Sequence, residues 1–405
     1  MASPKVYFPG LYGLRFVSAI AILIVHVELT KKAMGHGEGL WFDPDNTERV
    51  ATTPFAAIMN GDVRWEAALI MSFGPQALIF FFVLSGFLVT FLLFEEKRVT
   101  QTVSLKKFFY RRFLRLWPLY YVFVILGFFV LPHFDWFYIP KQLAFVQENY
   151  WTIFLCFIFL LPNLAMSIFP SPFPNVGQMW SIGMEEQFYI IWPVMLKYVK
   201  HALFAMIAIM VLILAVKVFI YLLPDGQPIV AVAKRFFGMF KVEPIALGGI
   251  GAYILFFNKT SWLKFIYHPV VQVLAIASIP AIALFLPNSL LNAAHLVYSI
   301  PALVICMNVG ANPKSLLKLN HGWLDYLGKI SYGIYMFHFV CITFTLHMLE
   351  AMLDLPQRLG MWNNLLVYVI AIGLTIGVSA LSYEYFEKRF LVRKKKFVTV
   401  ESGKI

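Results

Sequence analysis

Long apolar runs follow one another along the whole chain, and they constrain its fold more than any other feature. Hydrophobic residues fill 60% of the 405 positions, whereas charged residues fill 13%, about half the share of an average soluble domain. The runs are also too continuous for the strands of a membrane barrel, in which apolar and polar residues alternate. We therefore predict an all-α, polytopic membrane protein.

The predicted membrane segments follow directly from these runs. They lie at about 11–29, 70–93, 117–132, 151–168, 184–199, 202–223, 243–257, 268–286, 291–309, 327–349 and 364–386. If every run crossed the bilayer, the N-terminus and the C-terminus would lie on opposite sides. The run at 151–168 is the best candidate for one that does not cross, because Pro162, Pro170 and Pro172 interrupt helices. The sequence predicts about ten transmembrane helices plus one re-entrant or interfacial segment at about 151–168.

Charged residues orient these segments. Lysine and arginine gather in the loop 95–116 and in the cluster Arg393–Lys396. Because such clusters mark cytoplasmic loops, we expect both termini in the cytoplasm and the acidic segment 31–69 outside it. We expect one membrane domain, 1–388, followed by a basic cytoplasmic tail, 389–405. The net charge of +12 then points to the lipid bilayer as a partner, without nucleic acid.

The first apolar run carries two ionisable residues, Arg15 and His26, with ten residues between them. Eleven helical positions advance about 1100°, so both side chains lie on one face, about 16 Å apart along the axis. An ionisable residue at such a depth is a functional candidate, and an imidazole suits a general base near neutral pH. Glu28 follows at the extracytoplasmic end. His26 is therefore our candidate catalytic residue; the alternative is a hydrogen-bonded histidine of the core.

Two arginines of the basic loop, Arg112 and Arg115, are three positions apart and share a helix face beside aromatic residues. Their fork-shaped guanidinium groups suit phosphate recognition, and the neighbouring rings suit a stacked base. The alternative is ordinary charge that orients the membrane segments. Both interpretations stay open at this point.

The segment that begins at Trp180 combines carboxylates with aromatic residues. Ser181, Glu185 and Tyr189 recur every four positions and so form one stripe on a helix. Glu185 and Glu186 are adjacent carboxylates in this aromatic segment. Such a combination is typical of a carbohydrate site, because aromatic rings stack on the C–H surfaces of sugars and carboxylates accept hydrogen bonds from sugar hydroxyl groups. The alternative is a pair of acidic residues that the helix dipole favours in a first turn.

Two further signals are a serine and a second intramembrane histidine. Ser85, next to Gly86 in a bulky run, indicates close helix packing, and the sequence marks no base for a nucleophilic role. Tyr335 and His338 are three positions apart and share a helix face. We favour a structural hydrogen-bonding role for His338 over catalysis.

Taken together, these motifs resemble those of the integral-membrane acyltransferase-3 family, which transfers acyl groups, typically acetyl, to sugars and related hydroxylated substrates. The resemblance covers nearly the whole chain and is carried by Arg15 with ten residues before His26, Phe-Phe-Val-Leu-Ser-Gly-Phe at 81–87, Arg-Phe-Leu-Arg at 112–115, Trp-Ser through Glu-Glu to Tyr at 180–189, and Ser-Tyr through Tyr to His at 331–338. The chain departs from the family at Tyr12, where an Asp is usual, and at Phe339-Val340, where an aromatic residue and Pro are usual.

The resemblance implies a site and its substrates. His26 would be catalytic, and Arg15, Arg112 and Arg115 would bind the phosphates of an acyl-CoA donor, most simply acetyl-CoA, on the cytoplasmic side. The remaining site residues would line the acceptor side of the active site, and they are Glu28, Ser85, Trp180, Ser181, Glu185, Glu186, Tyr189, Tyr335 and His338. The acceptor would be a carbohydrate or lipid-linked glycan of the cell envelope, and the protein would lie in the inner membrane of a bacterium.

We expect no permanently bound cofactor and no metal, because the three cysteines lie inside apolar runs without paired spacing. The oligomeric state stays open. The alternative function is a proton-coupled transporter or exporter in which His26 and Glu28 form a relay. That class typically has related halves, and we find no internal repeat in the sequence.

Overall fold

The computed structural model describes residues 5–36, 53–59, 65–139, 148–169, 175–287, 295–353 and 360–402. Within these ranges the elements are β1 (Lys5–Val6), α1 (Leu11–Ala33), α2 (Pro54–Met59), α3 (Trp65–Thr100), α4 (Leu105–Ile125), α6 (Tyr150–Ile158), α7 (Pro162–Ile168), α8 (Met179–Tyr198), α9 (Ala202–Leu222), α10 (Pro228–Met239), α11 (Val242–Phe256), α12 (Thr260–Ile266), α13 (Pro269–Phe285), α14 (His295–Ala311), α15 (Gly322–Lys329), α16 (Ser331–Leu353), α17 (Met361–Ser382), α18 (Lys388–Lys394) and β2 (Glu401–Ser402). Much of the predicted outer segment 31–69 lies outside the described residues.

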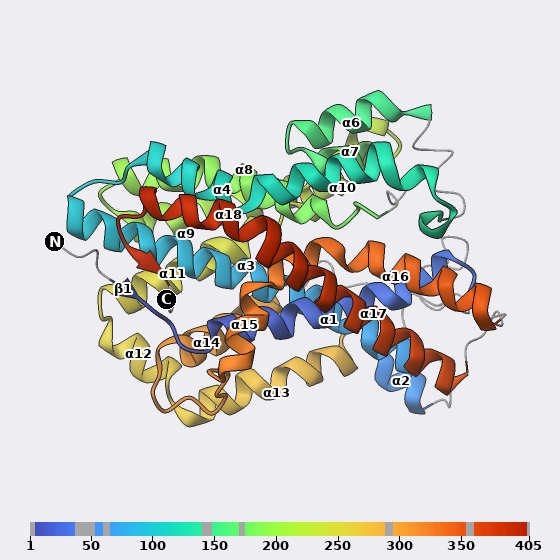
Figure 1. Ribbon diagram of the computed structural model, residues 1–405. Helices are drawn as coiled ribbons and strands as arrows, with labels where there is room; N and C mark the ends of the chain where they lie inside the picture. The colour runs from blue at the N-terminus through green and yellow to red at the C-terminus, as the bar shows by residue number, and fades with distance from the viewer. Residues whose placement is uncertain are drawn as a thin grey trace.

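The fold is a bundle of long apolar helices (Figure 1), as predicted. Seven helical spans of the described part are long and apolar enough to cross a membrane, and α12 with α13, bent by 54°, makes an eighth. Two further helices pack in the bundle: α8 has 20 residues but carries two glutamates, and α14 has 17 residues. A crossing needs about 20 residues. The all-α, multi-pass class is confirmed, and the predicted number of about ten is approximate.

The segment 151–168 does not form one continuous helix. It folds as α6 and α7, which have 9 and 7 residues, and Leu160 between them has a positive φ of 59°. At 1.5 Å per residue, the two helices reach only about 14 and 11 Å, so neither spans the hydrocarbon core. This broken segment agrees with the re-entrant or interfacial segment that the prolines predict.

Helix α3 is the central element, because α1, α11 and α14 all pack against it. Two glycines permit its closest contact, with α11. A Cβ at Gly86 would lie 1.9 Å from the carbonyl oxygen of Ile245, and one at Gly248 would lie 2.0 Å from that of Val83. The backbones can approach this closely only because both side chains are absent, which confirms the close packing expected beside Ser85.

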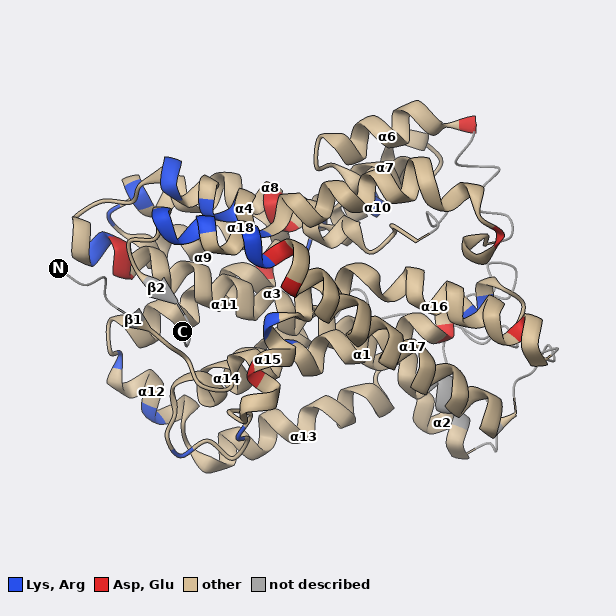
Figure 2. Cartoon of the chain, viewed as in Figure 1, with Lys and Arg blue, Asp and Glu red and all other residues tan. Residues whose placement is uncertain are grey.

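The two ends of the described chain meet. Strands β1 and β2 are parallel and pair Lys5 with Glu401, and α18 packs against α4. The described part of the predicted basic tail is therefore folded onto the bundle. Lysine and arginine residues of α4 and α18 gather toward this same end of the molecule (Figure 2), and some of them line the cavities described below.

Candidate active site

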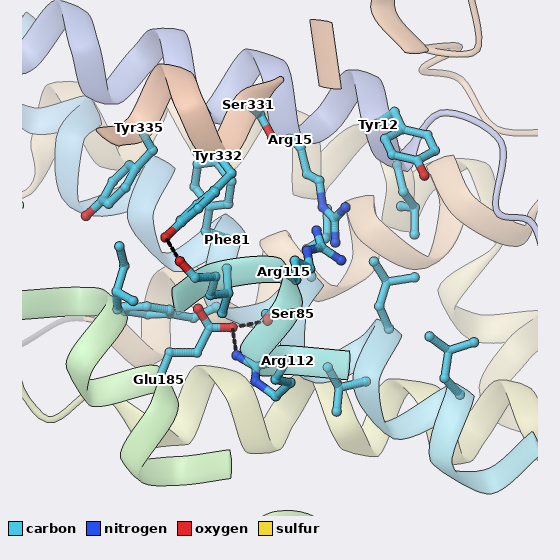
Figure 3. Close-up of a pocket in the computed structure, with 18 of the residues that line it drawn as sticks. Tyr12, Arg15, Phe81, Ser85, Arg112, Arg115, Glu185, Ser331, Tyr332 and Tyr335 are labelled. Atoms are coloured by element: carbon cyan, nitrogen blue, oxygen red, sulfur yellow. Dashed lines mark hydrogen bonds and ion pairs between the residues drawn. The ribbon is translucent and has the colours of Figure 1, made fainter. Parts of the chain in front are cut away.

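A cavity of about 190 Å³ lies between α1, α3, α4, α8 and α16 (Figure 3). It brings together predicted site residues from all five helices, namely Arg15, Ser85, Arg112, Arg115, Ser181, Glu185 and Tyr335. Residues that follow β1 also line it. Among them, Tyr7 donates a hydrogen bond to Asp325 at 3.3 Å, and burial together with the nearby Asp325 carboxylate raises the pKa of Tyr7, so its phenol stays protonated. The cavity is thus formed by segments far apart in sequence.

Two arginines place positive charge in this cavity. The guanidinium groups of Arg15 and Arg115 lie next to each other (Figure 3). In the part of the chain that the structure describes, neither makes an ion pair, and the contact of Arg15 is with the ring of Tyr12, 5.9 Å from its centroid. Two neighbouring cations that make no ion pair repel each other in a space of low polarity. The pair therefore forms a site for an anion.

Arg112 lines the same cavity, but its charge is neutralised within the protein. Its Nε and Nη2 donate to Oε1 of Glu186 at 2.9 and 2.6 Å, and Glu185 lies 3.7 Å from Nη2. The guanidinium also stacks over the ring of Tyr189, 3.8 Å from its centroid. Trp117 donates to the other oxygen of Glu186 at 3.1 Å. Arg112 thus holds two carboxylates in place, which distinguishes it from Arg115.

Glu185 links this ion pair to α3. The hydroxyl of Ser85 donates to Glu185, and it lies 3.0 Å from the hydroxyl of Tyr189. The sequence marks no base for Ser85, yet the fold supplies a carboxylate from a residue 100 positions away. Glu185 lies beside the arginines (Figure 3), so its contacts belong to the same end of the cavity as the predicted donor residues.

Tyr335 and Ser181 close another side of the cavity. Their hydroxyl oxygens are 2.6 Å apart, and both groups reach the carbonyl oxygen of Gln178, at 2.9 and 3.2 Å. The ring of Tyr335 lies 6.2 Å from that of Phe81. These buried contacts between α8 and α16 fix the wall of the cavity nearest to the histidines.

His26 and His338 form a hydrogen-bonded pair that lies outside the lining of the cavity. Nδ1 of His26 is 2.7 Å from Nε2 of His338, and the two ring planes differ by 9°. Nδ1 of His338 is 2.7 Å from the carbonyl oxygen of Tyr335. The ring of Phe339 packs against His26 with 4.4 Å between centroids. The cavity wall at Tyr335 is therefore hydrogen-bonded to His338 and, through it, to His26.

These contacts define the tautomers of the neutral pair. A carbonyl oxygen only accepts, so Nδ1 of His338 carries its proton and Nε2 is an acceptor. Nδ1 of His26 must then donate, at 2.7 Å, which leaves the lone pair on Nε2 of His26. A histidine that acts as a general base usually has one ring nitrogen held by a hydrogen-bond partner, which leaves the other nitrogen basic. His338 is buried, as we expected for a hydrogen-bonding role.

The other predicted residues lie apart from the cavity lining. Glu28 accepts hydrogen bonds from Lys31, at 2.6 Å, and from Tyr368, so it belongs to an ion-pair cluster of its own. Trp180 is half-buried and does not line the cavity. Glu186 and Tyr189 surround Arg112, behind the lining. The fold therefore divides the predicted set into a cavity, a histidine pair and the separate cluster at Glu28.

Sequence reasoning missed a second cavity of about 100 Å³, lined by Glu96, Arg111 and Lys394 among others. It shares Arg112 and Arg115 with the first cavity. In the sequence, Lys394 was one of several basic residues in a tail, and no local signal distinguished it from its neighbours. Only the packing of α18 on α4 brings it to the arginines.

Comparison with known proteins identifies the family. A family model described as an acyltransferase domain matches residues 8–384. The chain is 29% identical over 355 residues to the peptidoglycan O-acetyltransferase OatA of Listeria monocytogenes, covering 80% of this chain and 52% of that protein. It is 25% identical over 422 residues to the O-acetyltransferase OatA of Staphylococcus aureus, covering 98% and 59%. The chain thus spans little more than half the length of these relatives.

No solved structure matches the chain. The family match nevertheless extends over nearly the whole chain, from the residues after β1 to the end of α17. It includes every helix that lines the main cavity, and it confirms the resemblance that the motifs predicted. The chain is a multi-pass membrane protein that belongs to the acyltransferase-3 family.

Proposed function

We propose that the chain is a membrane-bound O-acyltransferase that moves an acetyl group from acetyl-CoA to a hydroxyl group of a cell-envelope glycan. The observation that carries this proposal is the arrangement of α1. Its Arg15 lies in a cavity beside Arg115, with neither paired to a described carboxylate, while its His26 lies three turns along the same face and is hydrogen-bonded to His338. An anion site and a candidate base thus lie on one helix, about 16 Å apart along its axis.

The donor would bind through its charged end. Arg15 and Arg115 would contact the diphosphate of coenzyme A, since a guanidinium group pairs well with phosphate oxygens. The flexible pantetheine arm would then run along α1 and bring the thioester toward His26. Basic residues mark the cytoplasmic side of membrane proteins, and the gathering of charge at α4 and α18 (Figure 2) supports a cytoplasmic position for this entrance and for both termini.

The reaction would use His26 as the general base. Nε2 of His26 would take the proton of the acceptor hydroxyl as that oxygen attacks the thioester carbonyl carbon. The carbon–sulfur bond would then break, and the thiolate of coenzyme A would receive the proton from His26. His338 would keep Nδ1 of His26 protonated throughout, through the 2.7 Å hydrogen bond. Positioned proton transfer of this kind typically contributes about 10²–10⁴-fold to the rate.

The acceptor class rests on the relatives. One relative is named a peptidoglycan O-acetyltransferase, so we propose a glycan of the cell envelope, with the enzyme in the inner membrane of a bacterium. A hydroxyl group of such a polymer would reach His26 from the side opposite to the arginines. Ser181 and Tyr335, which line the cavity wall nearest to the histidines, would contact the acetyl group or the sugar.

The alternative of a proton-coupled transporter needs a relay between His26 and Glu28. In the described residues, His26 is instead bonded to His338, and Glu28 is held by Lys31 and Tyr368. This arrangement favours the acyltransferase over the exporter.

The test is to follow radiolabel from [acetyl-¹⁴C]acetyl-CoA into envelope glycans in membrane vesicles. We compare the wild type with His26→Ala, and use His201→Ala as a matched control, because His201 is exposed at the start of α9. The proposal predicts label in the glycan for the wild type and the control, and none above background for His26→Ala. Equal labelling by a folded His26→Ala variant would eliminate His26 as the base, and no labelling by the wild type would reject the activity.

A further inference from the structure

The second cavity adjoins the first but has a different wall. Its lining includes Val398 and Val400 of the C-terminal segment, and the two cavities share Arg112, Arg115 and two apolar residues of α3. The side chains of Arg112 and Arg115 therefore face both cavities, so that one ligand with two anionic groups could contact Arg115 from either side.

The second cavity contains more positive than negative charge. Arg111 is paired with Glu96 at 2.7 Å and donates to the carbonyl oxygen of Phe397 at 3.0 Å, and Arg112 is paired with Glu186. The two remaining basic residues of the lining are Arg115 and Lys394, and within the described ranges neither makes an ion pair. A small space with two basic residues that make no ion pair favours an anion with more than one charge, which would in turn stabilise the protonated form of Lys394.

The chain fixes Lys394 at this place by several contacts. Helix α18 packs on α4, the ring of Phe397 stacks on that of Tyr110 with 4.7 Å between centroids, and Arg111 holds the backbone of Phe397. Beyond it, β2 pairs with β1. These contacts order the described part of the tail as a wall of the cavity. The next residues, Lys395 and Lys396, are exposed and belong to the surface.

We infer that this second cavity binds the 3′-phosphate of coenzyme A through Lys394 and Arg115. The inference rests on the proposed function, and it extends the donor site to a segment that the sequence assigned to a simple basic tail. Coenzyme A carries two anionic groups on its nucleotide, a diphosphate and a phosphomonoester, and the structure has two adjoining basic cavities that share Arg115. A phosphomonoester has a charge near −2, and lysine binds it as a point charge.

The experiment compares two ligands that differ only in this phosphate, coenzyme A and 3′-dephospho-coenzyme A. Their binding to the full chain is measured by calorimetry in nanodiscs of phosphatidylcholine, which supplies no anionic headgroup. For the wild type we expect coenzyme A to bind about tenfold more tightly than the dephospho form, the size of one charge-assisted hydrogen bond. Lys394→Ala should lower this preference severalfold by weakening coenzyme A alone, because Arg115 remains in place.

Matched variants separate the role of Lys394 from tail folding. Lys396→Ala removes an exposed charge two positions away and should keep the full preference. Lys394→Arg retains a cation and should keep most of it, so the comparison remains informative even if the alanine variant unfolds. Thermal unfolding of each variant establishes that the compared proteins are folded.

Three outcomes would overturn the inference. If the wild type binds both ligands with equal affinity, or if Lys394→Ala weakens the binding of both by the same factor, the second cavity does not bind the 3′-phosphate. If phosphatidylglycerol raises the unfolding temperature of the wild type but not of Lys394→Ala, while both nucleotides bind alike, the cavity takes a lipid phosphate. Failure of the proposed donor itself looks different, since the wild type would then bind neither ligand.

Discussion

Removal of Arg112 is the perturbation for which the structure gives the clearest expected magnitude. The Arg112 side chain is 14% exposed and that of Glu186 is 10% exposed, with 2.6 Å between their charged atoms. Arg112→Ala would leave the Glu186 carboxylate nearly buried, with the indole of Trp117 as its remaining donor. Breaking a buried ion pair by removing one partner costs about 3–5 kcal/mol. We expect a loss of folding stability of that size.

The assay is thermal unfolding of the purified protein in nanodiscs, followed by tryptophan fluorescence. The matched control is Lys388→Ala, which removes a lysine from the pair with Glu384, where the two side chains are 55% and 39% exposed. An exposed pair is worth about 0–1 kcal/mol. Arg112→Ala should therefore lower the unfolding temperature clearly, and Lys388→Ala should leave it almost unchanged.

A double variant tests the stated cause. If an orphaned charge is responsible, Arg112→Ala combined with Glu186→Gln should be more stable than Arg112→Ala alone, because the neutral amide needs no counter-ion and still accepts from Trp117. Residues in one ion-pair network are expected to show such coupling. The reasoning is refuted if the two substitutions add, or if Arg112→Ala is no more harmful than Lys388→Ala.

Three further predictions follow from individual contacts. His338→Ala should lower kcat about 10–100-fold without a change in the donor KM, because Nδ1–H of His26 would lose its hydrogen-bond acceptor, at a free-energy cost of about 1–3 kcal/mol. His338→Gln can still accept that hydrogen bond and should retain part of the rate. Equal kcat values for the wild type and both variants would contradict this. Arg115→Ala should raise the donor KM about tenfold or more in steady-state kinetics, and a change in kcat alone would count against phosphate binding. Gly86→Ala should destabilise the fold by about 1–3 kcal/mol in thermal unfolding, because its Cβ would lie 1.9 Å from a backbone oxygen of α11, whereas Gly373→Ala has nothing within 4 Å and should be neutral.

The sequence predicts the helical architecture well because membrane helices are specified locally. Each apolar run contains its own signal, and prolines mark the break in the segment 151–168, which folds as α6 and α7. The number of membrane crossings is harder to derive from the sequence, because two helices lie at the limit of what can cross. Helix α8 carries Glu185 and Glu186 inside an otherwise apolar stretch, and α14 is short.

The site is predictable in part, for a related reason. Arg15 and Arg115 line one cavity, in keeping with the sequence, which predicts both of them near the same membrane boundary. What the sequence does not contain is the choice of partner across helices. Arg112 and Arg115 look alike in sequence, yet only Arg112 meets the carboxylates of α8. The pairing of His26 with His338 likewise depends on how α1 packs against α16.

Lys394 illustrates the same limit. Its neighbours Lys395 and Lys396 have the same side chain but are exposed, so residue type could not select the one that enters the cavity. Its placement depends on α18 packing on α4 and on the pairing of β1 with β2, contacts between the two ends of the chain. Long-range contacts of this kind leave no periodic pattern in the sequence.

The most direct test of the central claim is the rate of acetyl transfer by His26→Gln, measured with the purified chain in nanodiscs, labelled acetyl-CoA and an envelope glycan. Donor binding is measured by calorimetry on the same preparations. If His26 is the base and the arginines bind the donor, His26→Gln should bind acetyl-CoA as the wild type does and should transfer acetyl at least about a hundredfold more slowly. Transfer at the wild-type rate by the folded variant would contradict the account.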